Sequence, residues 1–376
     1  MDTCLLKSTE CNVQRRQFIS GSLAILCLTK STFSFAKTVT KPALERIFTS
    51  PWLVNGVAVS TDGASFINLP RFKGHSDSPG LARITLSGPV AFPGNHWNEW
   101  QDGDEGINTL VNINACHIFD NELIWVVDQG APQGDKPKAG AAKLVAFDIN
   151  SGEAKNIIRF NEDSLPAGGT PNDLRIHGDL IYVTDSGLGG IIIHNLKSGQ
   201  TIRRLSASAL LRKPDNLVQK GFRSRVLQNA RGKMPDVHSD VIEVTADGNW
   251  LYYSTPTGPL YRIRTEYLFD NSYTDSMLEN KLEKVADIPS IGGSAIDADG
   301  NIYLSNVEKR SIDRLKPDGT INTLIQDDRL ETPDALVIIN GWVYIPAPQI
   351  EYLSQNNQGE DKTHQPWSIY RFRLPN

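Results

Sequence analysis

One short pattern recurs six times along this 376-residue chain. Each copy has a small polar residue, two apolar positions in alternation, a tight turn and an apolar run centred on an aromatic residue, as in NDLRIHGDLIYVTDSG. The copies begin 59, 58, 68, 52 and 42 residues apart, at Asn55, Asn114, Asn172, Asp240, Gly292 and Asp334. Their turns are Asp-Gly, Asp-Asn, His-Gly-Asp or Asn-Gly, the residues that hairpin turns with positive φ favour. The pattern therefore predicts six β-hairpins.

A second alternating pair of strands follows most of the hairpins, for example GIIIHNLKSGQTIRRL after the third copy. Each unit is then a four-stranded antiparallel sheet, which cannot bury both faces alone and must stack on its neighbours. Six such sheets in a ring form a six-bladed β-propeller, an all-β fold with few open edges. We expect the segment from Leu44 to Trp52 to complete the last sheet, so that residues 37–376 form one domain. A two-sheet sandwich would leave the repeat unexplained.

The first 36 residues resemble an export signal rather than part of the fold. Arg15 and Arg16 precede a short apolar run from Ser20 to Leu28, and Ser34-Phe35-Ala36 offers a small-x-small cleavage site. This arrangement is typical of a twin-arginine signal peptide, and the run is too short to span a bilayer as an anchor. We therefore expect residues 1–36 to be removed and the mature protein to be periplasmic or secreted, with no membrane span.

Charge and cysteine content exclude several partners. The 38 Lys and Arg against 43 Asp and Glu give a formal net charge of -5, without a basic stripe that could neutralise phosphates, so we expect no nucleic-acid partner. The cysteines other than Cys116 lie in the leader, so no intramolecular disulfide can form in the mature chain. The alternation around Cys116 favours a buried structural thiol over a nucleophile. We find no nucleophile elbow, phosphate loop, zinc-protease motif or dinucleotide fingerprint, and we expect a monomer.

The first residue of each hairpin should lie at one mouth of the central channel, if the first strand of each sheet is innermost. Five of these six positions carry Asn or Asp, and none carries sulfur or imidazole. Such oxygen ligands suit a hard divalent cation such as Ca²⁺. Asn and Asp also favour the turn before a strand, where their side chains bond nearby backbone, so both interpretations stay open. The candidate metal ligands are Asn172, Asp240 and Asp334, and the candidate ligand contacts include Asn55, Asn114, Asn172 and Asp173.

The second strand of each hairpin returns to the same mouth and brings further polar side chains there. Asp128, Asp185 and Asn306 end such strands. They are candidates for contact with a ligand, and Asp185 is also a candidate for proton transfer. Salt bridges and turn caps are the alternative roles for the two carboxylates.

Two further residues near this mouth have chemistry that a site could use. Arg71, in NLPRFKG, could clamp an anionic or carbonyl group, with a surface salt bridge as the alternative. His238 lies just before Asp240 and is a candidate general base, together with Asp334. Three segments that fit no sheet, residues 96–108, 128–142 and 212–239, are predicted to be loops over one face, where binding residues usually lie.

Several of these segments resemble the yellow and major royal jelly protein family. GVAVSTDGASFINLPRFKG is similar to the family's early strand with its Pro-Arg element, and DVIEVTADGNWLYYSTPTGPLYRIRTEYL is similar to its LYY segment. The resemblance covers most of the mature chain. It implies an exported six-bladed propeller, here a bacterial one, whose channel mouth binds small molecules. In insect members these include aromatic amines, and a dopachrome-converting activity is attributed to some.

The resemblance is shared with the gluconolactonase and regucalcin propellers, which place Asn and Asp around a divalent ion. By repeat position, Asn172 and either Asp240 or Asp334 match ligands of that ion, whereas Asn55 replaces the first carboxylate. Asp128 or Asp185 could supply the missing charge.

Three functions follow as hypotheses. The first is a propeller that binds a small polar or aromatic molecule at the channel mouth. The alternative is a Ca²⁺-dependent, gluconolactonase-like hydrolase that acts on lactones or esters. The third is a non-catalytic protein-interaction propeller.

Overall fold

The structure is a computed structural model that describes residues 42–375, except residues 134 and 207. The leader predicted at residues 1–36 lies outside the described residues. No helix within the described part of the chain is long and apolar enough to cross a membrane.

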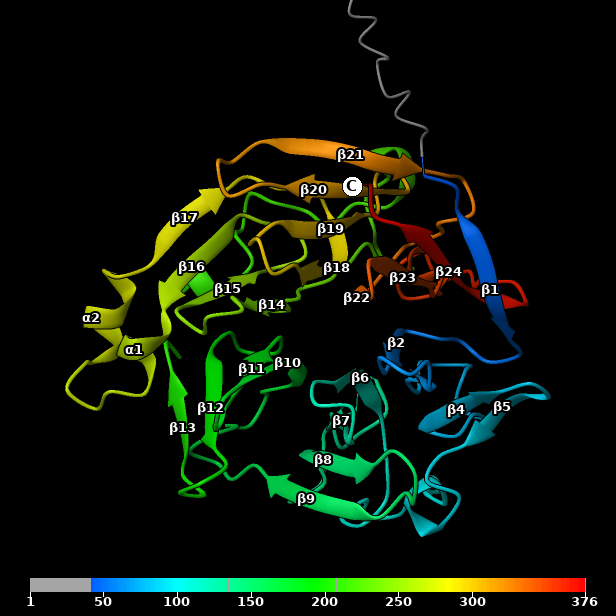
Figure 1. Cartoon of the computed structure of the whole chain (residues 1–376), viewed down its shortest axis with the longest axis horizontal. Coiled ribbons are helices and arrows are strands. Elements are labelled where there is room, and N and C mark those ends of the chain that lie inside the picture. The colour runs from blue at the N-terminus through cyan, green and yellow to red at the C-terminus, as the bar shows by residue number, and fades with distance from the viewer. Residues whose placement is uncertain (1–41, 134, 207, 376) are drawn as a thin grey trace, which may run out of the picture. The chain divides into compact units, whose positions relative to one another are not determined.

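The described residues form six four-stranded antiparallel sheets around a central channel (Figure 1). The first blade contains β2 (Gly56–Val59), β3 (Ser65–Asn68), β4 (Leu81–Thr85) and β5 (Gly88–Ala91). The second contains β6 (Ile113–Ile118), β7 (Leu123–Asp128), β8 (Lys143–Asp148) and β9 (Ala154–Arg159). The third contains β10 (Pro171–His177), β11 (Leu180–Asp185), β12 (Ile191–Asn195) and β13 (Thr201–Arg204). The fourth contains β14 (Val241–Val244), β15 (Trp250–Ser254), β16 (Leu260–Arg264) and β17 (Glu283–Ala286). The fifth contains β18 (Ile291–Ile296), β19 (Ile302–Asn306), β20 (Ser311–Leu315) and β21 (Ile321–Gln326).

The sixth blade joins the two ends of the ring. It contains β22 (Val337–Ile339), β23 (Trp342–Ala347), β24 (Trp367–Arg373) and, as its outermost strand, β1 (Glu45–Ser50). β1 pairs antiparallel with β24, from Glu45 opposite Arg371 to Ser50 opposite Trp367. The predicted six-bladed fold and its closure by the segment after Leu44 are therefore confirmed.

The core lies between the blades, because each sheet buries both faces against its neighbours. Each of six buried apolar clusters in the described chain combines residues of two adjacent blades, as where Phe66 of β3 packs with Phe147 of β8. The aromatic residue at the centre of the second strand belongs to this core in most blades: Phe66, Trp125 and Tyr182 are at most 3% exposed. Cys116 is buried in the first of these clusters, and burial raises the pKa of its thiol, as expected for a structural residue.

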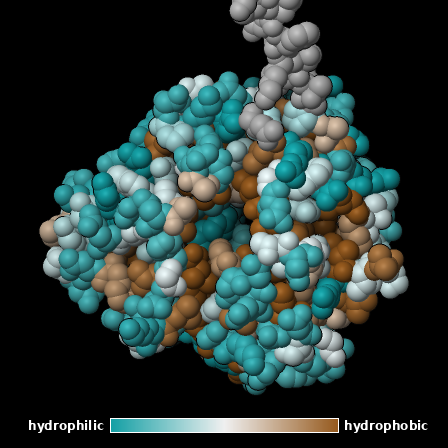
Figure 2. Space-filling view, in the orientation of Figure 1, coloured by the Kyte–Doolittle hydropathy of each residue, from teal (hydrophilic) through white to brown (hydrophobic). Residues whose placement is uncertain are grey.

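The first strand of each repeat is innermost, so the six hairpin starts meet at one mouth of the channel (Figure 1). The space-filling view shows a hollow near the centre of the ring (Figure 2). Long connections precede β6 and β14 and separate β7 from β8 and β23 from β24. Short helices lie in the connections: η1 (His96–Asn98), η2 (Ala209–Leu211), η3 (Phe222–Ser224), α1 (Thr265–Leu268), α2 (Asp275–Glu279) and η4 (Ile350–Tyr352).

Candidate functional site

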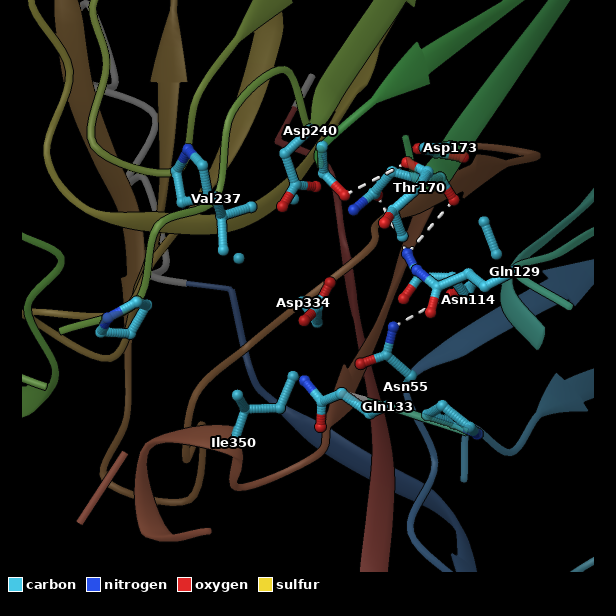
Figure 3. A pocket seen from close by; sticks show the side chains of 18 of the residues that line it. Asn55, Asn114, Gln129, Gln133, Thr170, Asp173, Val237, Asp240, Asp334 and Ile350 are labelled. Atoms are coloured by element: carbon cyan, nitrogen blue, oxygen red, sulfur yellow. Dashed lines mark hydrogen bonds between the residues drawn. The ribbon is translucent and has the colours of Figure 1, made fainter. Parts of the chain in front are cut away.

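A cavity of about 310 Å³ occupies the channel mouth where the innermost strands begin. Its floor comes from the hairpin starts, including Asn55, Asn114, Asp240 and Asp334 (Figure 3). Its walls and roof come from three connections, at residues 129–137, 219–237 and 350–356. The first two connections belong to the predicted loops at 128–142 and 212–239, whereas no residue of the predicted loop at 96–108 lines the cavity. A rigid ring thus supplies the polar floor, and loops determine what can enter.

Three asparagines form a hydrogen-bonded chain across one side of the floor. The Asn55 Nδ2 donates to the Asn114 backbone oxygen at 3.1 Å, and the Asn114 Nδ2 donates to the Asn172 Oδ1 at 2.9 Å. The chain spans three neighbouring blades. The Asn55 Oδ1 is buried and has no hydrogen-bond partner among the described residues. A buried acceptor without a partner is costly, so this oxygen is a natural contact for a donor on a ligand.

Asp240 and Asp334 bring two carboxylates to the floor from the fourth and sixth blades. Each backbone N–H bonds to the second strand of its own hairpin, Asp240 to Ser254 at 2.9 Å and Asp334 to Pro346 at 3.2 Å. These bonds hold the backbone while the side chains face the cavity (Figure 3).

Burial and repulsion from neighbouring carboxylates make both carboxyls hard to ionise. Burial, with a smaller contribution from the Asp173 charge, raises the pKa of Asp240 from 3.8 to about 8. Burial and the neighbouring Asp240 raise the pKa of Asp334 well above its ordinary value, although the Ala335 N–H opposes this. Burial at the floor therefore favours the neutral form of both carboxyls, and a bound cation would favour the ionised form.

Asp173 lines the same cavity but is fully paired. Its Oδ1 lies 2.7 Å from the His117 Nε2, and its Oδ2 lies 2.9 Å from the Arg175 Nη1. Burial favours the neutral acid, but the Arg175 charge and His117 outweigh it and hold the pKa of Asp173 well below its ordinary value. Arg175 is in turn held by both carboxylate oxygens of Glu243, at 2.8 and 2.9 Å. Asp173 therefore stays charged, whereas Asp240 and Asp334 have no such counterion among the described residues.

Sequence reasoning missed His117, Arg175 and Glu243. Each lies three positions after a hairpin start, on the innermost strand of three successive blades. In the other three blades this position is apolar. The sequence signal for this network was a polar residue, in three blades, at a repeat position that is apolar in the other three.

The structure does not bring Asp128 or Asp185 into the cavity. Both are fully buried and accept backbone N–H groups of the connections beside them, for example from Val111 to Asp128 and from Thr170 to Asp185. Each also has a buried cationic partner: the Lys143 Nζ lies 2.8 Å from Asp128, and the Arg203 Nη2 lies 2.7 Å from Asp185. Both side chains therefore fasten connections at the mouth.

Asn306, Arg71 and His238 also lie outside the cavity lining. Asn306 donates to Asp313 at 2.7 Å inside the fifth blade. Arg71 is buried and donates to backbone oxygens, including that of Val111 at 2.7 Å, instead of forming a surface salt bridge. The His238 Nδ1 accepts the Lys213 N–H at 3.2 Å, and burial lowers its pKa. All three side chains are committed to contacts within the protein.

The predicted metal ligands supply oxygen atoms only, which fits a hard cation. The unpartnered Asn55 Oδ1 and the two uncompensated carboxyls are the features that a cation would satisfy. Against this, the described residues contain no group of three or more His, Cys, Asp or Glu arranged to hold a metal ion. Any cation here would therefore depend on Asn side chains as well as on Asp240 and Asp334.

Fold and site together define an all-β, six-bladed propeller with a polar cavity at the channel mouth. From residue 114 to residue 353 the sequence matches the major royal jelly protein family, and the chain belongs to that family. No curated protein matches the chain in sequence.

Solved structures of other propellers are similar in fold. Virginiamycin B lyase from Staphylococcus aureus is 12% identical, with a TM-score of 0.51 over 89% of this chain and 100% of that chain. A gluconolactonase from Xanthomonas campestris is 13% identical, with a TM-score of 0.53 over 89% and 90%. Regucalcin, a calcium-binding protein from Agrobacterium tumefaciens, is 14% identical, with a TM-score of 0.51 over 88% and 96%. At such identities the likeness concerns the fold alone.

Proposed function

We propose that this protein is an exported member of the family that binds a small polar or aromatic molecule in the cavity at the channel mouth. The observation that carries the proposal is the pairing of two uncompensated carboxyls, Asp240 and Asp334, with the unpartnered Asn55 Oδ1 in one cavity. Buried polar groups without partners destabilise a protein by themselves. Their retention together in a cavity is explained if a ligand satisfies them.

The floor favours a ligand that presents hydrogen-bond donors. The Asn55 Oδ1 and the unprotonated carboxyl oxygens of Asp240 and Asp334 offer acceptors, while the Nδ2 groups of Asn55 and Asn114 already donate within the protein. Hydroxyl, amide or ammonium groups would match these acceptors. The charge of Asp173 favours a donor over an acceptor in the same part of the floor. We propose Asn55, Asn114, Asn172, Asp173, Asp240 and Asp334 as the ligand contacts.

The other predicted residues have positioning roles in this proposal. Asp128, Asp185 and Arg71 hold the connections that frame the mouth, Asn306 holds the fifth blade, and His238 holds the 212–239 connection.

Binding can be tested with a screen of small hydroxylated, amide and amine compounds, followed by calorimetric titration of any hit. Asp334→Asn and Asn55→Ala should each weaken binding at least tenfold, because the first replaces a carboxyl oxygen by an amide donor that cannot ionise and the second removes the Oδ1 acceptor. Asp299→Asn changes an exposed carboxyl in the turn between β18 and β19 and is the matched control. Equal affinity of all three variants and the unaltered protein would refute the proposed site.

Export by the twin-arginine route belongs to the same proposal, with residues 1–36 as the signal. Replacing both Arg15 and Arg16 by Lys should leave the precursor in the cytoplasm, whereas the unaltered protein should reach the periplasm or medium with its N-terminus at Lys37. Normal export of the double variant would contradict the twin-arginine assignment.

A second candidate is a divalent-cation-dependent hydrolase of lactones or esters. The oxygen-only floor favours it, and the fold is similar to those of a gluconolactonase and a calcium-binding regucalcin. A bound Ca²⁺ would polarise a carbonyl or activate water. Asn172, Asp240 and Asp334 would hold it, and the positive charge of the ion would keep both carboxyls ionised.

Elemental analysis of the purified protein separates the two candidates. One equivalent of Ca²⁺, with lactone hydrolysis that is lost on chelation and in Asp334→Asn, would establish the hydrolase. Ligand binding by protein that contains no metal would establish the binder. Hydrolysis that survives both chelation and Asp334→Asn would exclude the cation-dependent hydrolase.

A further inference from the structure

A second cavity, of about 270 Å³, lies at the opposite ends of the innermost strands. All six blades contribute to it, and each contributes the residue four positions after its hairpin start. These six residues, which we call the aliphatic ring, are Val59, Ile118, Ile176, Val244, Ile296 and Ile338. Every member is β-branched and apolar, in contrast to the Asn and Asp of the first mouth.

Strand packing alone does not account for the aliphatic ring. Val59 is buried, but the other five members are only partly buried, and the neighbouring Phe119 is 39% exposed. At a solvent-exposed end of a strand, Thr would satisfy the same β-preference without presenting apolar surface to water. Partly exposed apolar residues that gather around a hollow, rather than scatter singly, indicate a contact surface.

The floor of the second cavity is polar, and its Arg175 and Glu243 side chains are paired with each other. His117, Arg175 and Glu243 line it. The Arg175 Nε and Nη2 donate to Glu243, and its Nη1 donates to Asp173 and to the Leu174 oxygen. Since all three guanidinium nitrogens are already donating, the part of this group left for a ligand is mainly its flat face.

The two cavities are separate. Of the residues that the structure describes, none lines both cavities, and Asp173 lines the first while its partners His117 and Arg175 line the second. The ion-pair network therefore lies between the two cavities. A molecule bound at one mouth does not occupy the other.

We propose that the second cavity is a binding site for a small uncharged aromatic molecule, whose ring packs within the aliphatic ring and against the face of Arg175. Apolar walls with a few polar groups are typical of small-molecule sites, and a guanidinium face stacks well on an aromatic ring. An anionic ligand is disfavoured, because Asp173 and Glu243 already pair with Arg175, and any ligand charge buried here without its own partner would cost free energy. This inference is independent of the function proposed for the first mouth.

The test uses 5-fluoroindole as the probe and follows its ¹⁹F resonance during titration with the full purified protein. We expect saturable binding that Ile296→Arg and Ile118→Arg each weaken at least tenfold, because the new side chains would fill the cavity with charge. Val90→Arg is the matched control, since Val90 is an exposed apolar residue of the outer strand β5, and it should bind normally. Asp334→Asn should also bind normally, because Asp334 belongs to the first cavity.

Circular dichroism and thermal unfolding establish that each variant is folded, and either variant of the aliphatic ring is sufficient if the other does not fold. Absence of saturable binding, or equal binding by the unaltered protein and the ring variants, would overturn the proposal. Loss of probe binding in Asp334→Asn but not in the variants of the aliphatic ring would place the probe at the first mouth and would also overturn the proposal.

Discussion

The pKa of Asp240 gives a prediction about stability that needs no knowledge of the ligand. In the folded protein burial raises the pKa of this carboxyl to about 8, compared with 3.8 for the ordinary group expected in the unfolded chain. Between these two values the unfolded state releases a proton that the folded state keeps. The contribution of Asp240 to the free energy of unfolding should therefore be largest below pH 3.8. It should fall as the pH rises and level off above about pH 8.

The magnitude follows from proton linkage. Within the window one bound proton separates the two states, so the free energy of unfolding falls by about 1.4 kcal/mol per pH unit. Between pH 5 and pH 7 the contribution of Asp240 is a loss of about 3 kcal/mol, an upper limit because water can relax around a partly buried group. The pKa of Asp334 is raised too, and its contribution has the same sign. The pKa of Asp173 is lowered, so its effect lies at more acidic pH and does not cancel that of Asp240.

Urea titrations followed by tryptophan fluorescence at pH 5, 6, 7 and 8 would measure this. Asp240→Asn should unfold with a shallower dependence on pH and be more stable than the unaltered protein at pH 8, because it buries a neutral amide instead of a carboxyl. Asp299→Asn, the exposed control, should keep the original dependence. If Asp240→Asn and the unaltered protein have parallel pH profiles, the carboxyl is already ionised in the folded state and the reasoning is wrong.

Three further predictions concern the framework of the site. Lys143→Met should lower the free energy of unfolding, measured by urea titration, by about 3–5 kcal/mol, because it leaves the buried Asp128 without its cation. The control Lys155→Met, in an exposed ion pair, should leave the free energy of unfolding unchanged. Arg175→Met should destabilise the protein by a similar amount, about 3–5 kcal/mol, since Asp173 and Glu243 both lose their partner; equal unfolding midpoints would show that the network does not stabilise the channel. Removal of residues 1–50 should abolish cooperative thermal unfolding by uncovering the edge of β24, and removal of residues 1–41 should not.

The ring of blades could be predicted from the sequence because every blade has to meet the same structural requirements. Each hairpin needs a tight turn, and each sheet needs an apolar second strand to pack on its neighbour, so Phe66, Trp125 and Tyr182 recur at nearly the same distance from the start. The closing strand was predictable for a related reason, since the sixth repeat lacked one strand and the segment after Leu44 was unassigned.

Residues of the candidate site were predictable only where strand register determines that they line the cavity. Asn55, Asn114 and Asn172 line the cavity because the first position of an innermost strand lies at the mouth. Asp128 and Asp185 are at the same mouth, opposite Ile113 and Pro171 in register. Their side chains nevertheless bond backbone N–H groups of adjacent connections, and the paths of those connections are not encoded in any short pattern.

The charged network between the two cavities also determines what each cavity can bind. Arg175 bonds to both Asp173 and Glu243, so the only fixed cation of the network is used within it. The first mouth then keeps the uncompensated acidity of Asp240 and Asp334, which favours donors and cations, while the second receives a polar floor whose guanidinium is already paired, beneath the aliphatic ring. Because both conditions depend on Arg175, replacing it by Met should change ligand preference at both mouths at once, whereas substitutions at Asp334 or Ile296 should each affect a single mouth.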